Sequence, residues 1–558
     1  MLGWNWEEDM EKLDSLLAFV KSEVKFYNRQ DDVLSIELKD TNRPDLWSVE
    51  GLSRTLRGFL KKDKGLKRYE VRKPLLKVNV DARLNKIRPF ICCSVVKNVK
   101  LTDAIIRGLM HMQDKLDQTY GRNRQKTSIG IYDYDLISPP LSYTVAKPNE
   151  ISFVPLGAEE NISLGEILEK HPKGVEYGHI VKDYKLYPIL MDSNLKVLSF
   201  PPIINSNDLG RVTEITKNLL VEVTGTLHQT VLDTLNLVTL ALIDRGGQAY
   251  AATVHYPSGA SNALGKVVTP NFSSKKMELV VSYANKVLGL QLTPEYITEL
   301  LSVAGFGVKK VEGETIELQV PCYRVDMMHQ VDLVEEIAIA HGYDRIKPLW
   351  RDLPTTGSAR PEQRLIDTAK EVMVGLGFQE ILTYTLTNSE NLFNKMFCKP
   401  TPTAEVANPK VMTMTCLRSW LLPSLMEFFE NNKSVEFPQR IFELGKVTIL
   451  DETLETRTRD EEWLSAATAH PTACFSEIKS DLDAFFMNFD IDWEIRETDH
   501  PTFIDGRVGY ALVKGNIVGF LGEVSPKVLE AWKLENPVAA LEINIHKIIN
   551  SKLAKKNE

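Results

Sequence analysis

The residues best suited to chemistry are four acids in the segment PCYRVDMMHQVDLVEE, residues 321–336. Asp326 precedes a predicted helix, and Asp332, Glu335 and Glu336 take positions i, i+3 and i+4 within it. That spacing puts three carboxylates on one helix face, where like charges repel by roughly 0.2–0.5 kcal/mol per pair. A hard divalent cation such as Mg²⁺ prefers carboxylate oxygens and would turn this repulsion into binding. The spacing therefore indicates a cation site.

A capping box is the structural alternative for the same acids. Asp332 as the N-cap, with Glu335 at the third helical position, would satisfy free backbone N–H groups without any metal. Acids in a first helical turn also interact favourably with the helix dipole. Capping explains neither Glu336 nor Asp326, so both interpretations stay open.

An internal comparison comes from residues 33–59, VLSIELKDTNRPDLWSVEGLSRTLRGF, which resemble a second copy of the acidic segment. Each copy has a strand, an Arg-x-Asp sequence (Arg43/Asp45 and Arg324/Asp326) and an apolar helix. We interpret the first Arg-x-Asp as a structural turn in which Arg43 clamps its own domain. Alignment of the helices puts Glu50 opposite Glu335, Trp47 opposite Asp332 and Gly51 opposite Glu336. The first copy makes its fold without two of the helix acids, which favours the cation.

Composition excludes several classes of protein. The 558 residues suffice for roughly three or four domains, and 43% hydrophobic with 25% charged residues is ordinary for a globular chain. The sequence has no apolar run long enough for a membrane span, and an acidic start argues against a signal peptide. Six cysteines without a CxxC pair suggest neither zinc nor disulfides, so we expect a cytoplasmic protein.

Net charge gives no general attraction to nucleic acid, because it is −8. Residues 61–88 are the local exception, with eleven Lys or Arg against three acids, and are the best candidate for a phosphate contact. No P-loop, dinucleotide fingerprint, HExxH or GxSxG sequence occurs. The chain therefore shows no self-contained active site.

The pattern of elements predicts an α+β, multidomain fold. Thr102 or Asp103 caps a helix that ends at Gly121, and Gly515-Asn516 marks a hairpin. In LLVEVTGT, alternation places Leu220, Glu222, Thr224 and Thr226 on one strand face, for which a solvated surface is the structural alternative. The expected domains are residues 1–75, 76–268, 269–350 and 351–558.

Five segments together resemble the β subunit of phenylalanyl-tRNA synthetase of the archaeal or eukaryotic type: NRPDLWSVEG, YRVDMMHQVDLVEE, HGYDRI, VANP and LRSWLLPSL. The resemblance covers nearly the whole chain in order. It implies an α₂β₂ assembly with a catalytic α subunit, which joins phenylalanine to tRNA(Phe) with ATP. ATP and phenylalanine would bind through the α subunit. It also implies that Asp326, Asp332, Glu335 and Glu336 hold a Mg²⁺ shared with that subunit.

The middle domain is similar to the family's editing domain, which hydrolyses tyrosine wrongly attached to the tRNA. An apolar pocket rejects an added hydroxyl by only about 10²-fold, so a second site is useful. Glu222 would accept a bond from the tyrosine hydroxyl, with Thr224 on the same face and water as the nucleophile. The family position at 222 often carries the shorter Asp. Leu190, Ser199 and Arg211 match further editing positions, and Asn205 is a weaker addition.

The last domain resembles a class II synthetase core that has lost its chemistry, so we expect it not to bind ATP. Arg440 and Glu443 match the residue types of a family motif that binds ATP, but at shifted positions. The closing segment of the chain offers no further arginine to bind ATP. We expect the apolar helices of this domain to build the subunit interface. Against that resemblance, we expect the chain to lack the C-terminal tRNA-binding domains of bacterial relatives and to lack the family's usual first strand before Met1. The alternative function is a non-catalytic scaffold or nucleic-acid-binding protein built from synthetase-like domains.

Overall fold

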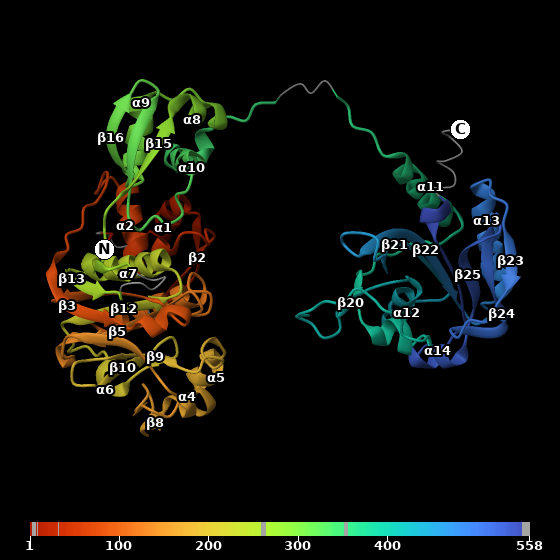
Figure 1. Ribbon diagram of the computed structural model, residues 1–558. Coiled ribbons are helices and arrows are strands. Elements are labelled where there is room, and N and C mark those ends of the chain that lie inside the picture. Colours follow the sequence, from red (N-terminus) through yellow and green to blue (C-terminus); the bar gives the residue numbers. More distant parts are fainter. Residues whose placement is uncertain (3–6, 8, 32, 258–263, 351–354, 549–558) are drawn as a thin grey trace. The chain divides into compact units, whose positions relative to one another are not determined.

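The computed structural model describes residues 1–2, 7, 9–31, 33–257, 264–350 and 355–548 (Figure 1). The chain divides into two compact units, residues 1–349 and 350–558. Within the described ranges, no helix combines the length and the apolar character that crossing a membrane requires.

The first unit begins with a small segment built on helices α1 (Met10–Leu17) and α2 (Val49–Phe59). Strands β1 (Ser22–Asn28) and β2 (Val33–Leu38) form an antiparallel hairpin beside them. Ser48 caps α2 by accepting from the Gly51 amide. The core of this segment consists of Leu13, Leu16, Leu17, Val20, Leu46 and Leu56.

A ten-stranded sheet occupies the middle of this unit, in the order β11-β10-β9-β6-β3-β13-β4-β12-β5 with β14 paired to β13. Its strands are β3 (Arg72–Val80), β4 (Phe90–Lys97), β5 (Thr127–Asp133), β6 (Leu141–Ala146), β9 (Tyr187–Met191), β10 (Val197–Phe200), β11 (Ile204–Asn205), β12 (Leu219–Gly225), β13 (Gln248–His255) and β14 (Lys266–Thr269). Strands β7 (Ser152–Phe153) and β8 (Ile162–Ser163) form a separate pair. The helices of this region are α3 (Asp103–Gln118), α4 (Leu164–Lys170), α5 (Pro172–Tyr177), α6 (Asn207–Gly210) and α7 (His228–Asp244).

Every residue of β12 is buried, because β4 and β5 flank it on both edges and α7 packs against its face. The solvated alternative for the face of Glu222 and Thr224 is therefore wrong. The predicted helix cap is confirmed, since Thr102 Oγ1 accepts from the Ile105 amide at the start of α3.

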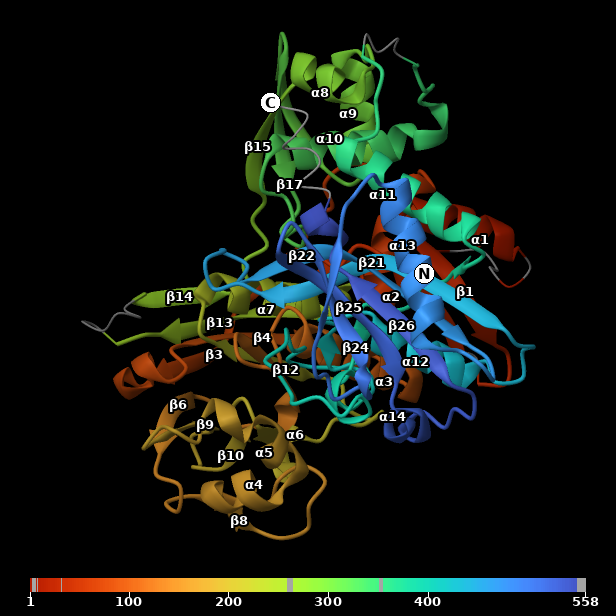
Figure 2. The ribbon, with the colours of Figure 1, turned by 90° about the vertical axis from the view of Figure 1, so that its right-hand side faces the viewer.

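The acidic segment belongs to a third body of the first unit, seen as α8, α9 and α10 beside a sheet in Figure 2. Its strands, in the order β15-β17-β16, are β15 (Lys275–Val280), β17 (Thr315–Val320) and β16 (Gly307–Glu312). Its helices are α8 (Val281–Leu288), α9 (Pro294–Val303) and α10 (Gln330–His341). Apolar residues of α10, including Leu333, Val334 and Ile337, fill its core.

The second unit contains a seven-stranded sheet in the order β18-β21-β22-β26-β25-β24-β23, antiparallel except for the β18–β21 pair. The strands are β18 (Gln379–Glu380), β21 (Gln439–Leu450), β22 (Thr458–Ala469), β23 (Glu494–Glu497), β24 (Phe503–Val513), β25 (Asn516–Val524) and β26 (Val538–Ile543). A short pair, β19 (Leu386–Thr387) and β20 (Cys416–Leu417), lies outside it. The helices are α11 (Pro361–Gly375), α12 (Leu422–Asn431), α13 (Phe475–Asn488) and α14 (Pro526–Ala531).

Two apolar cores cover the sheet of the second unit, one with α11 and α13 and the other with α12 and α14. The expected hairpin is confirmed, because Gly515 takes a φ of +76° between β24 and β25. Helix α12 buries Leu422, Leu425, Met426 and Phe429 inside the unit. Its apolar face is therefore already used within the chain, and an interface would have to use other residues.

Candidate functional site

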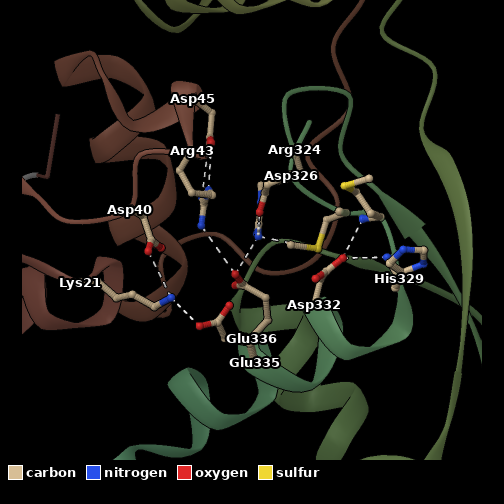
Figure 3. A network of polar contacts seen from close by, with 12 residues as sticks. Lys21, Asp40, Arg43, Asp45, Arg324, Asp326, His329, Asp332, Glu335 and Glu336 are labelled. Carbon is tan, nitrogen blue, oxygen red and sulfur yellow. Dashed lines mark hydrogen bonds and ion pairs between the residues drawn. The ribbon is translucent and has the colours of Figure 1, made fainter. Parts of the chain in front are cut away.

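Two of the four acids expected to hold a cation are buried against one arginine (Figure 3). Arg324 donates from Nε and Nη2 to the two oxygens of Asp326, at 2.9 and 2.7 Å. The same Nη2 donates to Glu336 Oε1 at 2.7 Å. Burial alone would raise the pKa of Asp326, but the bonds and the charge of Arg324 outweigh burial and lower that pKa. The positive charge of Arg324 thus compensates the negative charges of Asp326 and Glu336 within the chain.

The first copy of the Arg-x-Asp sequence joins the same contacts. Arg43 donates from Nε and Nη2 to Asp45 at 2.9 and 2.8 Å, which repeats the geometry of the second copy. Its Nη1 lies 3.6 Å from Glu336 Oε1. Arg43 therefore holds its own domain, as expected, and also reaches the acidic helix. We call Arg43, Asp45, Arg324, Asp326 and Glu336 the arginine network.

The remaining two acids lie outside this network. Helix α10 begins at Gln330 with His329 as its N-cap, and Asp332 is the third helical residue of a capping box. The capping-box alternative is thus confirmed for Asp332, but its place as the N-cap is wrong. Asp332 Oδ2 accepts from the amides of Met328 and His329, each at 2.7 Å. Glu335 is half exposed and binds Lys21 at 2.5 Å. Lys21 in turn binds Asp40 at 3.2 Å.

The four acids in this arrangement do not fit a single Mg²⁺ site. Within the described residues, no group of three or more His, Cys, Asp or Glu side chains is placed to hold a metal ion. Carboxylate oxygens suit Mg²⁺ chemically, but those of Asp326 and Glu336 already bind Arg324. Asp332 and Glu335 are the two acids that the network leaves available.

A second candidate site is a pocket of about 250 Å³ in the middle of the first unit. Its lining includes Ser128 from β5, Ser199 from β10, Asn205 from β11 and Glu222 from β12. Ligand pockets for drug-sized molecules usually measure about 300–1,000 Å³, so this one suits a group the size of a single side chain. Three of the six residues expected for editing, Ser199, Asn205 and Glu222, therefore line the same pocket.

Glu222 is the titratable group of this pocket. Its side chain accepts a hydrogen bond from the Tyr132 hydroxyl at 2.7 Å, and that hydroxyl lies 3.3 Å from Asn205 Oδ1. Burial raises the pKa of Glu222 to about 7, although the phenol of Tyr132 and the charge of Arg88 oppose the shift. Ser199 is 2% exposed and lines the same pocket, with its hydroxyl buried beside the Tyr132 phenol. A titratable acceptor and a buried hydroxyl thus lie at the same small cavity.

Thr224 is fully buried, is not among the residues that line the pocket, and supports Glu222 through a side-chain hydrogen bond. Its hydroxyl accepts from Arg88 Nε at 2.9 Å and lies 3.1 Å from Ser128 Oγ. Arg88 is buried and also donates to Ser128 Oγ at 3.0 Å and to the Thr224 carbonyl at 2.8 Å. This arginine ties β5 to β12 directly beside Glu222.

Two further residues expected for editing do not line the pocket. Leu190 is fully buried in the apolar core that also contains Tyr132 and Leu220. Arg211 is exposed and follows the short helix α6. Their direct roles stay predictions.

Comparison with known proteins follows the same division of the chain. The model of the tRNA synthetase B5 domain matches residues 277–343, and that of the phenylalanyl tRNA synthetase beta chain CLM domain matches residues 347–545. The phenylalanine–tRNA ligase beta subunit of Thermococcus onnurineus is 41% identical over 96% of this chain and 95% of its own. That of Pyrococcus furiosus is 42% identical over 96% of each chain.

The chain belongs to the phenylalanine–tRNA ligase β-subunit family. A solved N-terminal fragment of the β subunit from Pyrococcus horikoshii is 39% identical and superposes with a TM-score of 0.57, covering 60% of this chain and 95% of the fragment. As a β subunit of this ligase family, the chain carries its acidic residues 326–336 inside the B5 match.

Sequence reasoning missed several residues of this family member's pocket. Arg88 was noticed only as the end of a basic stretch, whereas it is 1% exposed and organises the pocket floor. Arg124 lines the pocket from a turn in which residues 122, 123 and 124 all have positive φ. Three consecutive non-glycine residues in that region are unusual, but the sequence carries no signal of them. Tyr132 also went unnoticed.

Proposed function

We propose that this chain acts as the β subunit of a phenylalanine–tRNA ligase and removes tyrosine from wrongly charged tRNA(Phe). The observation that carries the editing part is that Glu222, Ser199 and Asn205 line one small pocket. Phenylalanine, ATP and the synthesis of the aminoacyl bond belong to a partner α subunit in an α₂β₂ assembly. The names of the relatives and the match to the beta-chain models support this role.

The chemistry of the pocket suits a phenol better than a phenyl group. A tyrosyl hydroxyl would donate to Glu222 and reach Ser199 or Asn205, all of which line the cavity. A phenylalanyl ring offers no donor to these buried polar groups, and sites built to bond a substrate hydroxyl reject an analogue that lacks it by about 10⁴–10⁵-fold. The correct product would therefore be spared. Water then attacks the ester carbonyl, and the bond to the ribose oxygen breaks.

The test is hydrolysis of Tyr-tRNA(Phe) by the complex of both subunits. We expect the wild-type complex to clear the substrate and Glu222→Ala to lose most of that activity, while Phe-tRNA(Phe) formation stays unchanged. Glu169→Ala is the matched control, since Glu169 is an exposed acid of the same region on α4. Equal clearance by Glu222→Ala and wild type would remove the editing assignment. No clearance by either would favour the non-catalytic scaffold.

We also propose that the second unit is a class II synthetase-like domain without ATP chemistry. Glu443 is 1% exposed and forms an ion pair with Arg418 at 2.7 Å. Arg440 binds Asp481 at 2.7 Å and lies over the Phe378 ring. Both residues that resemble the ATP-binding motif thus already form ion pairs within this chain. The full chain without an α subunit should show no phenylalanine-dependent exchange of pyrophosphate into ATP; exchange above the blank would refute this.

The α subunit is proposed to dock on an exposed apolar surface of the second unit. Leu382, Tyr384 and Met412 are 81%, 77% and 78% exposed. Leu382 and Tyr384 line a hollow of about 420 Å³ next to α12. Exposed apolar groups gathered in this way mark interaction surfaces. Leu382→Asp combined with Tyr384→Ser should abolish co-purification with the α subunit, whereas Met487→Asp, at a residue 79% exposed on α13, should not.

Magnesium stays a prediction for this chain. We propose that an ion would use Asp332 and Glu335, the two acids outside the arginine network, together with oxygens of another chain. Mg²⁺ is commonly held by one or two carboxylates with several waters, which agrees with a site that this chain supplies only in part. We keep a cytoplasmic location as an expectation as well.

A further inference from the structure

Tyr132 stands between the core and the proposed editing pocket. It is fully buried on β5, while Glu222 is 2% exposed on the neighbouring β12. In the register of these strands Tyr132 is opposite Leu220 and Glu222 is opposite Gly130, so the two side chains meet diagonally. Diagonal pairs lie about 7–8 Å apart at their backbones, within reach of an aromatic side chain.

Gly130 makes room for this contact. A Cβ atom at Gly130 would lie 2.2 Å from the Tyr132 hydroxyl and 2.4 Å from Glu222 Oε2. Both distances are far below van der Waals contact, so any larger residue would push the phenol and the carboxylate apart. The glycine therefore has a local reason in the packing of this one hydrogen bond.

We infer that Tyr132 is the positioning residue for substrate recognition, holding one oxygen of Glu222 so that the other is presented to the hydroxyl of a tyrosyl ester. This inference rests on the proposed editing function. A carboxylate has two oxygens with about four acceptor sites, so a phenol on Oε2 leaves capacity for a second donor. The protein's own phenol thus binds Glu222 in the way that the substrate's phenol would, from the opposite side.

The surroundings of Glu222 leave few other groups to set its charge. Besides the phenol of Tyr132, the charge of Arg88 and a hydrogen bond from the Thr224 side chain act on Glu222, whereas Tyr143 and Cys93 are groups whose own pKa Glu222 raises. Tyr143 donates its hydroxyl to the Arg88 carbonyl at 2.9 Å and makes no part of the Tyr132 contact. Loss of the Tyr132 hydroxyl should therefore disfavour ionised Glu222 specifically.

The experiment measures kcat/KM for hydrolysis of Tyr-tRNA(Phe) by the two-subunit complex from pH 5.5 to 9. In Tyr132→Phe we expect a fall of about 10- to 100-fold, which corresponds to one hydrogen bond to a charged group. The pH midpoint assigned to Glu222 should move upward in the same variant. A purely structural role would not move that midpoint, because phenylalanine keeps the ring packing.

Two variants make the result decisive. Tyr143→Phe is the matched control, because it removes another fully buried phenol hydroxyl and should leave the midpoint in place. Gly130→Ala keeps both partners but separates them, and it should change rate and midpoint as Tyr132→Phe does. Wild-type rate and midpoint in Tyr132→Phe would overturn the inference while leaving the editing function intact. Absence of hydrolysis by the wild-type complex would overturn the proposed function first.

Discussion

Two buried glutamates of the first unit, Glu222 and Glu336, have opposite surroundings. Glu222 accepts from the neutral phenol of Tyr132, and burial raises its pKa to about 7. Glu336 accepts from the guanidinium of Arg324, with that of Arg43 3.6 Å away. Both are acids that the sequence marks as candidates for chemistry, yet they differ in which charge they meet.

The difference teaches how to separate a binding residue from a structural one. A buried acid bound by buried arginines has its charge and its acceptor sites used by the fold. An acid bound by one neutral donor keeps both an acceptor site and the ability to titrate near neutral pH, which is common at functional sites. By this criterion Glu222 is available to a ligand and Glu336 is not.

Removal of Arg324 should have the largest effect. Arg324→Ala leaves the side chain of Asp326 buried without its cation and Glu336 with Arg43 alone, 3.6 Å away, and breaking a buried pair in this way costs about 3–5 kcal/mol. Urea unfolding of the first unit should reveal a loss of that size. Arg345→Ala, at an exposed arginine of the same body, is the control. A loss below about 1 kcal/mol would mean that the network is no more than a surface ion pair.

The second prediction concerns the pH dependence of stability at Glu222. Its pKa is higher in the folded chain than the ordinary 4.5, so the folded state loses stability as pH rises from 4.5 to about 7. Glu222→Gln removes that loss and should raise the free energy of unfolding by about 3 kcal/mol above pH 7, with no gain near pH 4. The measurement is urea unfolding of both proteins at pH 4 and pH 8. A variant that is less stable at pH 8 would contradict the assignment.

The pH dependence of stability at Asp326 should have the opposite sign to that at Glu222. Its pKa is lower in the folded chain than the ordinary 3.8, so its stabilisation is present above that pH and disappears as pH falls through the folded pKa. Asp326→Asn should therefore cost about 2 kcal/mol at pH 7, the typical value of a hydrogen bond to a charged group. The difference from wild type should shrink below pH 3.8. A constant difference across pH would argue that packing, not charge, explains the loss.

Local features of the fold followed from the sequence because they depend on near neighbours. The Thr102 cap of α3 and the turn at Gly515 each involve a few consecutive residues. The sequence places the N-cap of α10 at Asp332, whereas the true N-cap is His329. The reason is that an acid can accept from backbone amides on either side of it along the chain. Asp332 binds backward to the amides of Met328 and His329 from inside the helix, whereas an N-cap binds forward.

The sites depended on contacts that alternation and spacing do not encode. Alternation placed Glu222 and Thr224 on one face, but their burial comes from strands that pair on both edges of β12. Tyr132 precedes Glu222 by 90 residues, and only the sheet register joins them. The comparison of the two Arg-x-Asp copies could not show that both arginines meet at one glutamate. The first copy lacks a counterpart of Glu336 because Arg43 and Arg324 both approach the same glutamate.

The smallest expected effect on stability is at Glu335, which lies outside the arginine network. Its contact with Lys21 joins side chains that are 50% and 30% exposed, and such pairs contribute at most about 1 kcal/mol. Glu335→Gln should thus leave unfolding nearly unchanged but lower the magnesium bound to the purified two-subunit complex, because it removes one of two available carboxylates. Glu336→Gln should do the reverse, weakening the fold and keeping the metal content. If Glu336→Gln releases magnesium while the free energy of unfolding stays as in wild type, Glu336 is a metal ligand in the assembled enzyme. Its ion pair with Arg324 would then form only when the α subunit is absent.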